Sequence, residues 1–143
     1  MPAKSSEVVV SLPDAVRRDM IAHAVADAPR ECCGLLVGEG WRVHESVRTT
    51  NREPGTTRYL VDPAEHVALL KRLRGGALDV IGGYHSHPRS PAWPSPSDIA
   101  DAFSEHFVYV IVSLAEAVPV VRAFRIEGSE VTALAIDDRV IRS

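Results

Sequence analysis

The chain has 143 residues, of which 45% are hydrophobic and 24% are charged, so it can bury the core of a globular domain without disulfide bonds. The formal net charge is -3 and there is no run of Lys or Arg, so the charge pattern does not support binding to nucleic acid or to a membrane surface. We expect a single domain over residues 1–143.

Hydrophobic periodicity and turn-forming residues define the expected elements. In chain order they predict a strand over 8–12, a helix over 13–28, strands over 33–37 and 41–48, a loop over 51–57, a strand over 59–61, a helix from 62 to about 75, a strand over 80–87, a loop over 89–94, a helix from 95, and strands over 108–112, 118–126 and 131–136. The third helix begins with an N-cap and an N1 proline, Ser95-Pro96, and is expected to turn Ile99, Ala102 and Phe103 inward.

The order of these elements predicts the fold class. Strands and helices follow one another as β-α-β-β-β-α-β-α-β-β-β, which is typical of an α/β sandwich. Residues 108–112 are apolar on both faces of their expected strand and therefore indicate a central position in the sheet. We expect an α/β fold in which helices pack against a mostly antiparallel sheet.

Two histidines at the end of one expected strand form the main chemical feature. Because strand side chains alternate, His85 and His87 point to the same face, with Cα atoms roughly 6.5–7 Å apart. Pro88 ends the strand, and Asp98 follows on the first turn of the next helix. Two imidazoles and one carboxylate are a ligand set that leaves a fourth zinc position open for water, as in catalytic zinc sites.

Each of these residues also has a plain structural interpretation. An isolated His-x-His pair is rarely a metal site. Asp98 and Ser95 are fully explained as a helix cap beside the positive end of the helix dipole. Without the other residues, Glu31 is interpreted as an acidic surface residue after the Pro29-Arg30 turn. Capping does not explain why two histidines on one strand face lead into that helix.

Other residues leave alternatives open. Trp93 can line a substrate groove or anchor its proline-rich loop, and Arg58 and Tyr59 can flank the groove. Cys32 and Cys33 are adjacent, with Cα atoms about 3.8 Å apart, which is short for a disulfide, so we expect reduced thiols packed in the core. Because no signal peptide is recognisable and the thiols are expected to be reduced, we expect a cytoplasmic location. Surface or structural roles are expected for the other histidines, His23, His44, His66 and His106.

The combined spacing resembles the signature of a known family. His85-x-His87, then seven residues, then Ser95-x-x-Asp98 resembles the H-x-H-x7-S-x-x-D signature of the JAMM/MPN (Mov34/MPN/PAD-1) zinc metalloproteases. That family also carries a glutamate before a small apolar strand, and Glu31 looks like that residue. The whole pattern is far more specific than either motif alone.

The resemblance covers most of the chain, from about Val8 to Ile136. It implies the family's cytidine-deaminase-like fold, with a curved and mostly antiparallel β-sheet sandwiched by about three helices. The chain is too short for the insertions of the members that cleave polyubiquitin, so it is most similar to the compact prokaryotic type. Those members imply a substrate that is the C-terminal tail of a ubiquitin-like or sulfur-carrier protein.

The resemblance also implies a role for each matched residue. His85, His87 and Asp98 would hold one Zn²⁺ per chain. Glu31 would act as the general base on the zinc-bound water and then protonate the leaving amine. Ser95 would donate a hydrogen bond to the developing oxyanion. The expected activity is hydrolysis of an amide or isopeptide bond.

Two other functions compete with this one. A non-catalytic MPN scaffold would only bind partner proteins, but such members usually lack zinc ligands, and all of them are present here. Nucleobase deamination needs H-x-E together with P-C-x-x-C, and neither occurs in the sequence. The identity of the substrate protein and the oligomeric state do not follow from the sequence.

Overall fold

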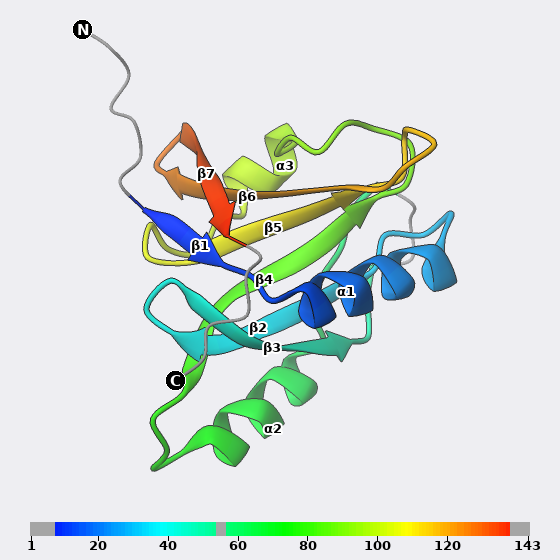
Figure 1. The fold of residues 1–143 in the computed structure, drawn as a ribbon. Helices are drawn as coiled ribbons and strands as arrows, with labels where there is room; N and C mark the ends of the chain where they lie inside the picture. Colours follow the sequence, from blue (N-terminus) through cyan, green and yellow to red (C-terminus); the bar gives the residue numbers. More distant parts are fainter. Residues whose placement is uncertain (1–7, 54–56, 138–143) are drawn as a thin grey trace, which may run out of the picture.

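The computed structural model describes residues 8–53 and 57–137. Its elements in chain order are β1 (Val9–Ser11), α1 (Asp14–Asp27), β2 (Cys33–Glu39), β3 (Arg42–Thr49), α2 (Pro63–Leu73), β4 (Asp79–His87), α3 (Pro96–Ala100), β5 (Val108–Ser113), β6 (Val120–Glu127) and β7 (Glu130–Asp137) (Figure 1). The expected α/β class with three helices is confirmed. None of the described helices is long and apolar enough to cross a bilayer.

The sheet is mixed and closes on itself in the order β1-β3-β2-β4-β5-β6-β7. Four neighbouring pairs are antiparallel, whereas β1 runs parallel to β3 and to β7, and β4 runs parallel to β5. The prediction of a mostly antiparallel curved sheet is therefore right only in part. The connection through α3 is a crossover that brings the chain back to the end of the sheet where β4 began, so β5 runs parallel to β4. β1 closes the sheet because it pairs with a strand on each side.

Two details of the expected elements are wrong. Residues 59–61 form no strand; only an isolated antiparallel bridge joins Val61 to Asn51. The third helix ends at Ala100, and Phe103 is 77% exposed instead of facing inward. The helix stops because the backbone N–H of Phe103 donates to the Tyr109 hydroxyl at 2.6 Å, so β5 holds this segment in a non-helical conformation.

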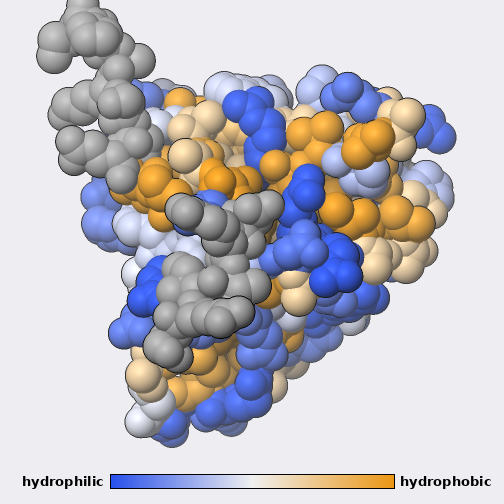
Figure 2. Space-filling model, viewed as in Figure 1, coloured by the Kyte–Doolittle hydropathy of each residue, from blue (hydrophilic) through white to orange (hydrophobic). Residues whose placement is uncertain are grey.

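The core lies on both faces of the sheet. One face packs against α1, whose buried residues Val16, Met20 and Ala24 belong to a single cluster with residues from all seven strands. The opposite face carries two smaller clusters, one formed with Leu69 of α2 and the other under the α3 segment with Ile111. On the side seen in Figure 2, exposed hydrophobic residues are interspersed with hydrophilic ones. The site described next lies on the strand face between α2 and α3.

Candidate metal centre

His85 and His87 lie at the end of β4, with their side chains on the same face of the sheet. β4 lies between β2 and β5: His85 is paired with Cys33 of β2 and with Ile111 of β5, and His87 is paired with Ser113 of β5. Both side chains are buried, with 3% and 4% of their surface exposed. The strand period therefore places two imidazoles side by side in a rigid and dry part of the sheet.

Asp98 reaches the same point from the start of α3. Ser95 is the N-cap, Pro96 follows at the first helical position, and Asp98 stands at the third. The Asp98 N–H donates to Ser95 Oγ at 3.1 Å, while the Ser95 N–H donates to Asp98 Oδ2 at 2.8 Å. This capping box fixes the carboxylate, so the capping and ligand interpretations of Asp98 are compatible.

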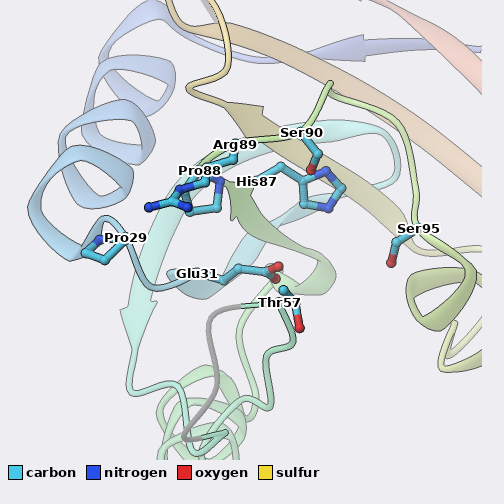
Figure 3. Close-up of a pocket in the computed structure, with 8 residues that line it drawn as sticks. All are labelled: Pro29, Glu31, Thr57, His87, Pro88, Arg89, Ser90 and Ser95. Carbon is cyan, nitrogen blue, oxygen red and sulfur yellow. The ribbon is translucent and has the colours of Figure 1, made fainter.

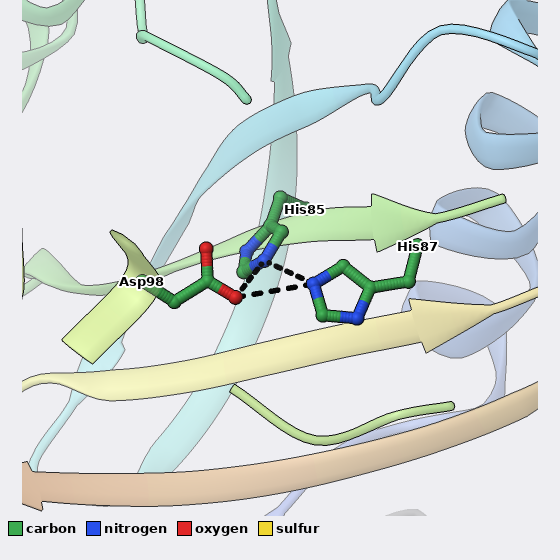
Figure 4. A group of neighbouring side chains, drawn as sticks. All are labelled: His85, His87 and Asp98. Atoms are coloured by element: carbon green, nitrogen blue, oxygen red, sulfur yellow. Dashed lines mark hydrogen bonds and ion pairs between the residues drawn. The ribbon is translucent and has the colours of Figure 1, made fainter. Parts of the chain in front are cut away.

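Three ligand atoms of these residues converge (Figure 4). His85 Nε2 lies 3.1 Å from His87 Nε2 and 3.0 Å from Asp98 Oδ2, and His87 Nε2 lies 3.1 Å from the same oxygen. Ligand atoms around a tetrahedral zinc with bonds of about 2.1 Å stand roughly 3.4 Å apart, so only small shifts separate this cluster from a zinc site. The donor set fits the metal.

Hydrogen bonding and burial set the protonation of the cluster. His87 Nδ1 lies 2.9 Å from the Pro91 carbonyl oxygen, which accepts its N–H and directs Nε2 toward the cluster. Burial alone would lower the pKa of His87, but its hydrogen bonds with Asp98 and Pro91 outweigh this and raise the pKa in the metal-free cluster, so a metal ion has to displace the Nε2 proton. Burial lowers the pKa of His85. Burial alone would raise the pKa of Asp98, but its hydrogen bonds with both imidazoles outweigh this and hold the pKa well below its usual range. A neutral imidazole and an ionised carboxylate are the forms that bind metal.

A carboxylate without a partner faces the same place. Glu31 is 6% exposed, and its Oε1 has no hydrogen-bond partner among the described residues. Burial raises the pKa of Glu31 to about 7, with a smaller opposing effect of His87. Leaving a buried carboxylate oxygen unpaired is costly, so its presence beside a potential metal site calls for a chemical reason.

Glu31 and His87 open onto one cavity of about 420 Å³ (Figure 3). Its lining residues are Pro29, Glu31, Thr57, His87, Pro88, Arg89, Ser90 and Ser95. Ser95 therefore meets the cavity as well as capping α3. The structure thus brings all five residues of the signature to one location: three in the cluster and Glu31, His87 and Ser95 on the wall of the cavity.

Two residues of the segment before α2 behave differently. Tyr59 lies flat against the His85 ring, with centroids 4.2 Å apart. Arg58 turns away and pairs with Asp101 at 3.8 Å. Of the two residues expected to flank the groove, Tyr59 contacts a cluster ligand. Its signal in the sequence was an aromatic residue at the start of a short expected strand after a turn-rich loop, which is too common to predict this contact.

The remaining candidates have structural roles. Burial raises the pKa of Cys32 to about 12 and that of Cys33 to about 11, so both remain thiols at neutral pH and pack in the core. Trp93 packs edge-on against Phe124 and does not line the cavity, which favours the loop-anchor interpretation. His23 is buried, with Nδ1 2.7 Å from the Tyr84 hydroxyl oxygen.

Comparison with known proteins defines the class. The family model described as "Prokaryotic homologs of the JAB domain" matches residues 13–127, and the chain belongs to this family, the compact prokaryotic branch of the JAMM/MPN proteins. A solved structure of protein DSY2949 from Desulfitobacterium hafniense superposes with a TM-score of 0.81 at 33% identity, covering 90% of this chain and 92% of that one.

Three curated relatives carry functional names. A "Probable TtuB-protein conjugate cleaving protease" of Thermus thermophilus is 36% identical over 66% of this chain and 64% of its own length, just under two thirds. A "Desampylase" of Haloferax volcanii is 33% identical over 73% of this chain and 80% of its own length. A "CysO-cysteine peptidase" of Mycobacterium tuberculosis is 35% identical over 66% of both chains. All three names describe cleavage of protein conjugates or peptides.

Proposed function

We propose that this protein is a zinc-dependent peptidase or isopeptidase that hydrolyses an amide bond at the C-terminal tail of a ubiquitin-like or sulfur-carrier protein. The observation that carries the proposal is the pairing of a convergent ligand cluster with the unpartnered, buried carboxylate of Glu31 on the adjoining cavity. The names of the relatives support the substrate class.

His85, His87 and Asp98 would hold one zinc ion, since together they offer two neutral nitrogens and one anionic oxygen within bonding reach. When bound there, zinc polarises a carbonyl and lowers the pKa of coordinated water toward about 7. The three residues also exclude bulk water from the ligand side, because all are at most about a tenth exposed.

Glu31 would move the proton. It takes one proton from the attacking water, whose oxygen forms the new bond to the scissile carbonyl carbon, and gives it to the nitrogen when the C–N bond breaks. In the metal-free protein burial raises the pKa of Glu31 to about 7, which makes this carboxylate a stronger base than an exposed glutamate. A group in this role typically contributes about 10²–10⁴ in rate.

Ser95 would orient the substrate carbonyl. Its Oγ accepts the Asp98 N–H at 3.1 Å, which leaves the hydroxyl proton available to a partner such as Ser97 Oγ or an oxygen in the cavity. Donation to the developing oxyanion is typically worth roughly 10²–10³ in rate. The tail itself is extended, and we propose that it docks as an added strand beside the cavity.

The test is a Glu31→Gln variant assayed at measured metal content. The substrate is a ubiquitin-like protein ending in Gly-Gly with an amine reporter joined to its last carbonyl. We expect about one zinc in both proteins and a loss of at least about 10²-fold in kcat for the variant. The matched control is Glu39→Gln, at an exposed position that ends β2, which should retain wild-type kcat.

Two results would contradict the proposal. Unchanged cleavage by Glu31→Gln would show that Glu31 is not the base. A wild-type protein that binds the ubiquitin-like protein, contains no zinc and cleaves nothing would favour the non-catalytic scaffold instead.

A further inference from the structure

Among the described residues that line the cavity, Arg89 is the only Lys or Arg, and it stands two residues after the cluster residue His87. We propose that Arg89 binds the α-carboxylate of the leaving group, so that the preferred substrate is a protein tail extended by a single amino acid. This inference rests on the proposed function and adds the chemistry of the leaving group to it.

The Arg89 guanidinium has no competing partner. Within residues 8–53 and 57–137 it makes no hydrogen bond or ion pair, whereas other arginines near the site are engaged: Arg30 donates to the Glu53 carbonyl at 2.7 Å, and Arg58 pairs with Asp101. A free guanidinium matches the planar, two-oxygen geometry of a carboxylate. Glu31 is the only acidic residue that the described part of the chain contributes to the cavity wall, and it does not pair with Arg89.

The backbone that carries Arg89 is held firmly. The Pro91 carbonyl accepts the His87 Nδ1–H at 2.9 Å, and the Ser90 carbonyl accepts the Ser113 hydroxyl at 2.6 Å. Pro88 removes one further torsional freedom immediately before Arg89. An arginine on a rigid backbone segment loses less conformational entropy when it binds a ligand, because only its side chain must be ordered.

The arrangement of the cavity fits a one-residue leaving group. Figure 3 shows Ser95 and Arg89 on opposite sides of His87, with the Glu31 carboxylate on the cavity wall below them. A substrate carbonyl can therefore meet Ser95 while the leaving side of the bond extends toward Arg89. The volume of about 420 Å³ is near the small end of ligand sites, which span roughly 300–1,000 Å³.

Covalent structure distinguishes the two kinds of leaving group. In a C-terminal amino acid, the carboxylate carbon is separated from the scissile nitrogen by one Cα atom, so the negative charge lies close to the breaking bond. In an isopeptide, the nitrogen is the end of a lysine side chain and has no carboxylate beside it. Hydrolysis consumes one water and releases the shortened tail as a carboxylic acid and the amino acid as a free amine, whose carboxylate stays ionised throughout.

Two substrates that differ only at their last group test this. One is a ubiquitin-like protein extended beyond Gly-Gly by one alanine with a free carboxylate; the other ends in alanine amide. With zinc-loaded wild-type enzyme we expect kcat/KM to favour the carboxylate about 10- to 100-fold, as for a hydrogen bond to a charged group. Arg89→Gln should bring the ratio close to one, mainly through KM, and Arg89→Glu should favour the amide.

Arg74→Gln is the matched control, because Arg74 is exposed at the end of α2 and does not line the cavity. It should keep the wild-type ratio. A wild-type ratio near one, a preference that survives in Arg89→Gln, or faster cleavage of a lysine isopeptide than of the one-residue extension would overturn the role of Arg89 while leaving the proposed hydrolase intact.

Binding gives a readout that does not depend on turnover. Calorimetry with zinc-loaded Glu31→Gln should show that a tail peptide ending in free alanine binds at least about tenfold more tightly than its amide, and that adding Arg89→Gln removes the difference. If the wild-type enzyme cleaves neither substrate, the hydrolase proposal fails. Equal binding of the two peptides would separately reject the carboxylate site at Arg89.

Discussion

The ring of Tyr59 lies parallel to the imidazole of His85, with centroids 4.2 Å apart and planes 18° apart. His85 has no hydrogen bond through Nδ1 among the described residues, unlike His87, whose Nδ1–H is accepted by Pro91. The stacked ring therefore holds the His85 imidazole together with the contacts of its Nε2 with His87 and Asp98. Tyr59 acts as a positioning residue for the cluster.

Removing the ring should weaken metal binding. We expect Tyr59→Ala to lower zinc affinity about 10- to 100-fold, the range seen when residues that support metal ligands are lost. Tyr59→Phe keeps the stacked face and should bind zinc nearly as the wild type does. Competition with a chromophoric chelator measures both. Equal losses in the two variants would show that the hydroxyl, and not the stack, is what matters.

Asn51 connects the Tyr59 segment to Glu31, which lies two residues before β2. Its Nδ2 donates to the Glu31 carbonyl at 2.9 Å and to the Arg58 carbonyl at 3.2 Å, and its Oδ1 accepts the Leu60 N–H at 2.9 Å. We expect Asn51→Asp, which replaces both donor hydrogens by an acceptor, to lower the free energy of unfolding by about 1–3 kcal/mol. Urea unfolding at pH 7 measures this. A change below about 0.5 kcal/mol would contradict the role of this amide.

The local parts of the site could be predicted from the sequence because they depend on short-range geometry. The period of two along β4 puts His85 and His87 on one face, and Ser95-Pro96 sets the start of α3 and so the position of Asp98. Their convergence on one point came from the family signature and not from periodicity.

The parts that the sequence did not predict depend on long-range packing. The parallel pairing of β4 with β5 follows from the crossover between them, which hydrophobic patterns do not specify. The position of Tyr59 depends on Asn51, whose amide replaces the ladder that a strand over 59–61 would have needed. Phe103 is exposed because the Tyr109 hydroxyl captures its backbone N–H, a contact between separate elements.

Glu31 should make the metal-free protein less stable at high pH. Burial raises its pKa from 4.5 to about 7, so the folded state favours the protonated form. By linkage, the free energy of unfolding is highest below pH 4.5 and falls as the pH rises toward about 7. Above that pH it stays lower, by up to about 3 kcal/mol. Glu31→Gln removes the buried charge and should be more stable than the wild type at pH 8 but not at pH 4.5.

Chemical denaturation of chelator-treated protein at the two pH values tests this prediction. Glu39→Gln, at an exposed position, should show no such difference. A Glu31→Gln variant that gains nothing at pH 8 would mean that the carboxylate is solvated or paired in solution, which would also weaken its assignment as a base with a raised pKa.

Gly34 is required by the packing of Tyr84 against β2. A Cβ at this position would overlap the phenol ring of Tyr84, whose hydroxyl oxygen is 2.7 Å from His23 Nδ1 in the core. Since that ring is 1% exposed and its hydroxyl is held, it cannot move aside at low cost. Gly34→Ala should therefore destabilise the protein by about 1–3 kcal/mol, measured by thermal or urea unfolding. Gly76→Ala, where the nearest atom is 3.4 Å from the added Cβ, should change stability little, and equal effects at the two glycines would refute the steric explanation.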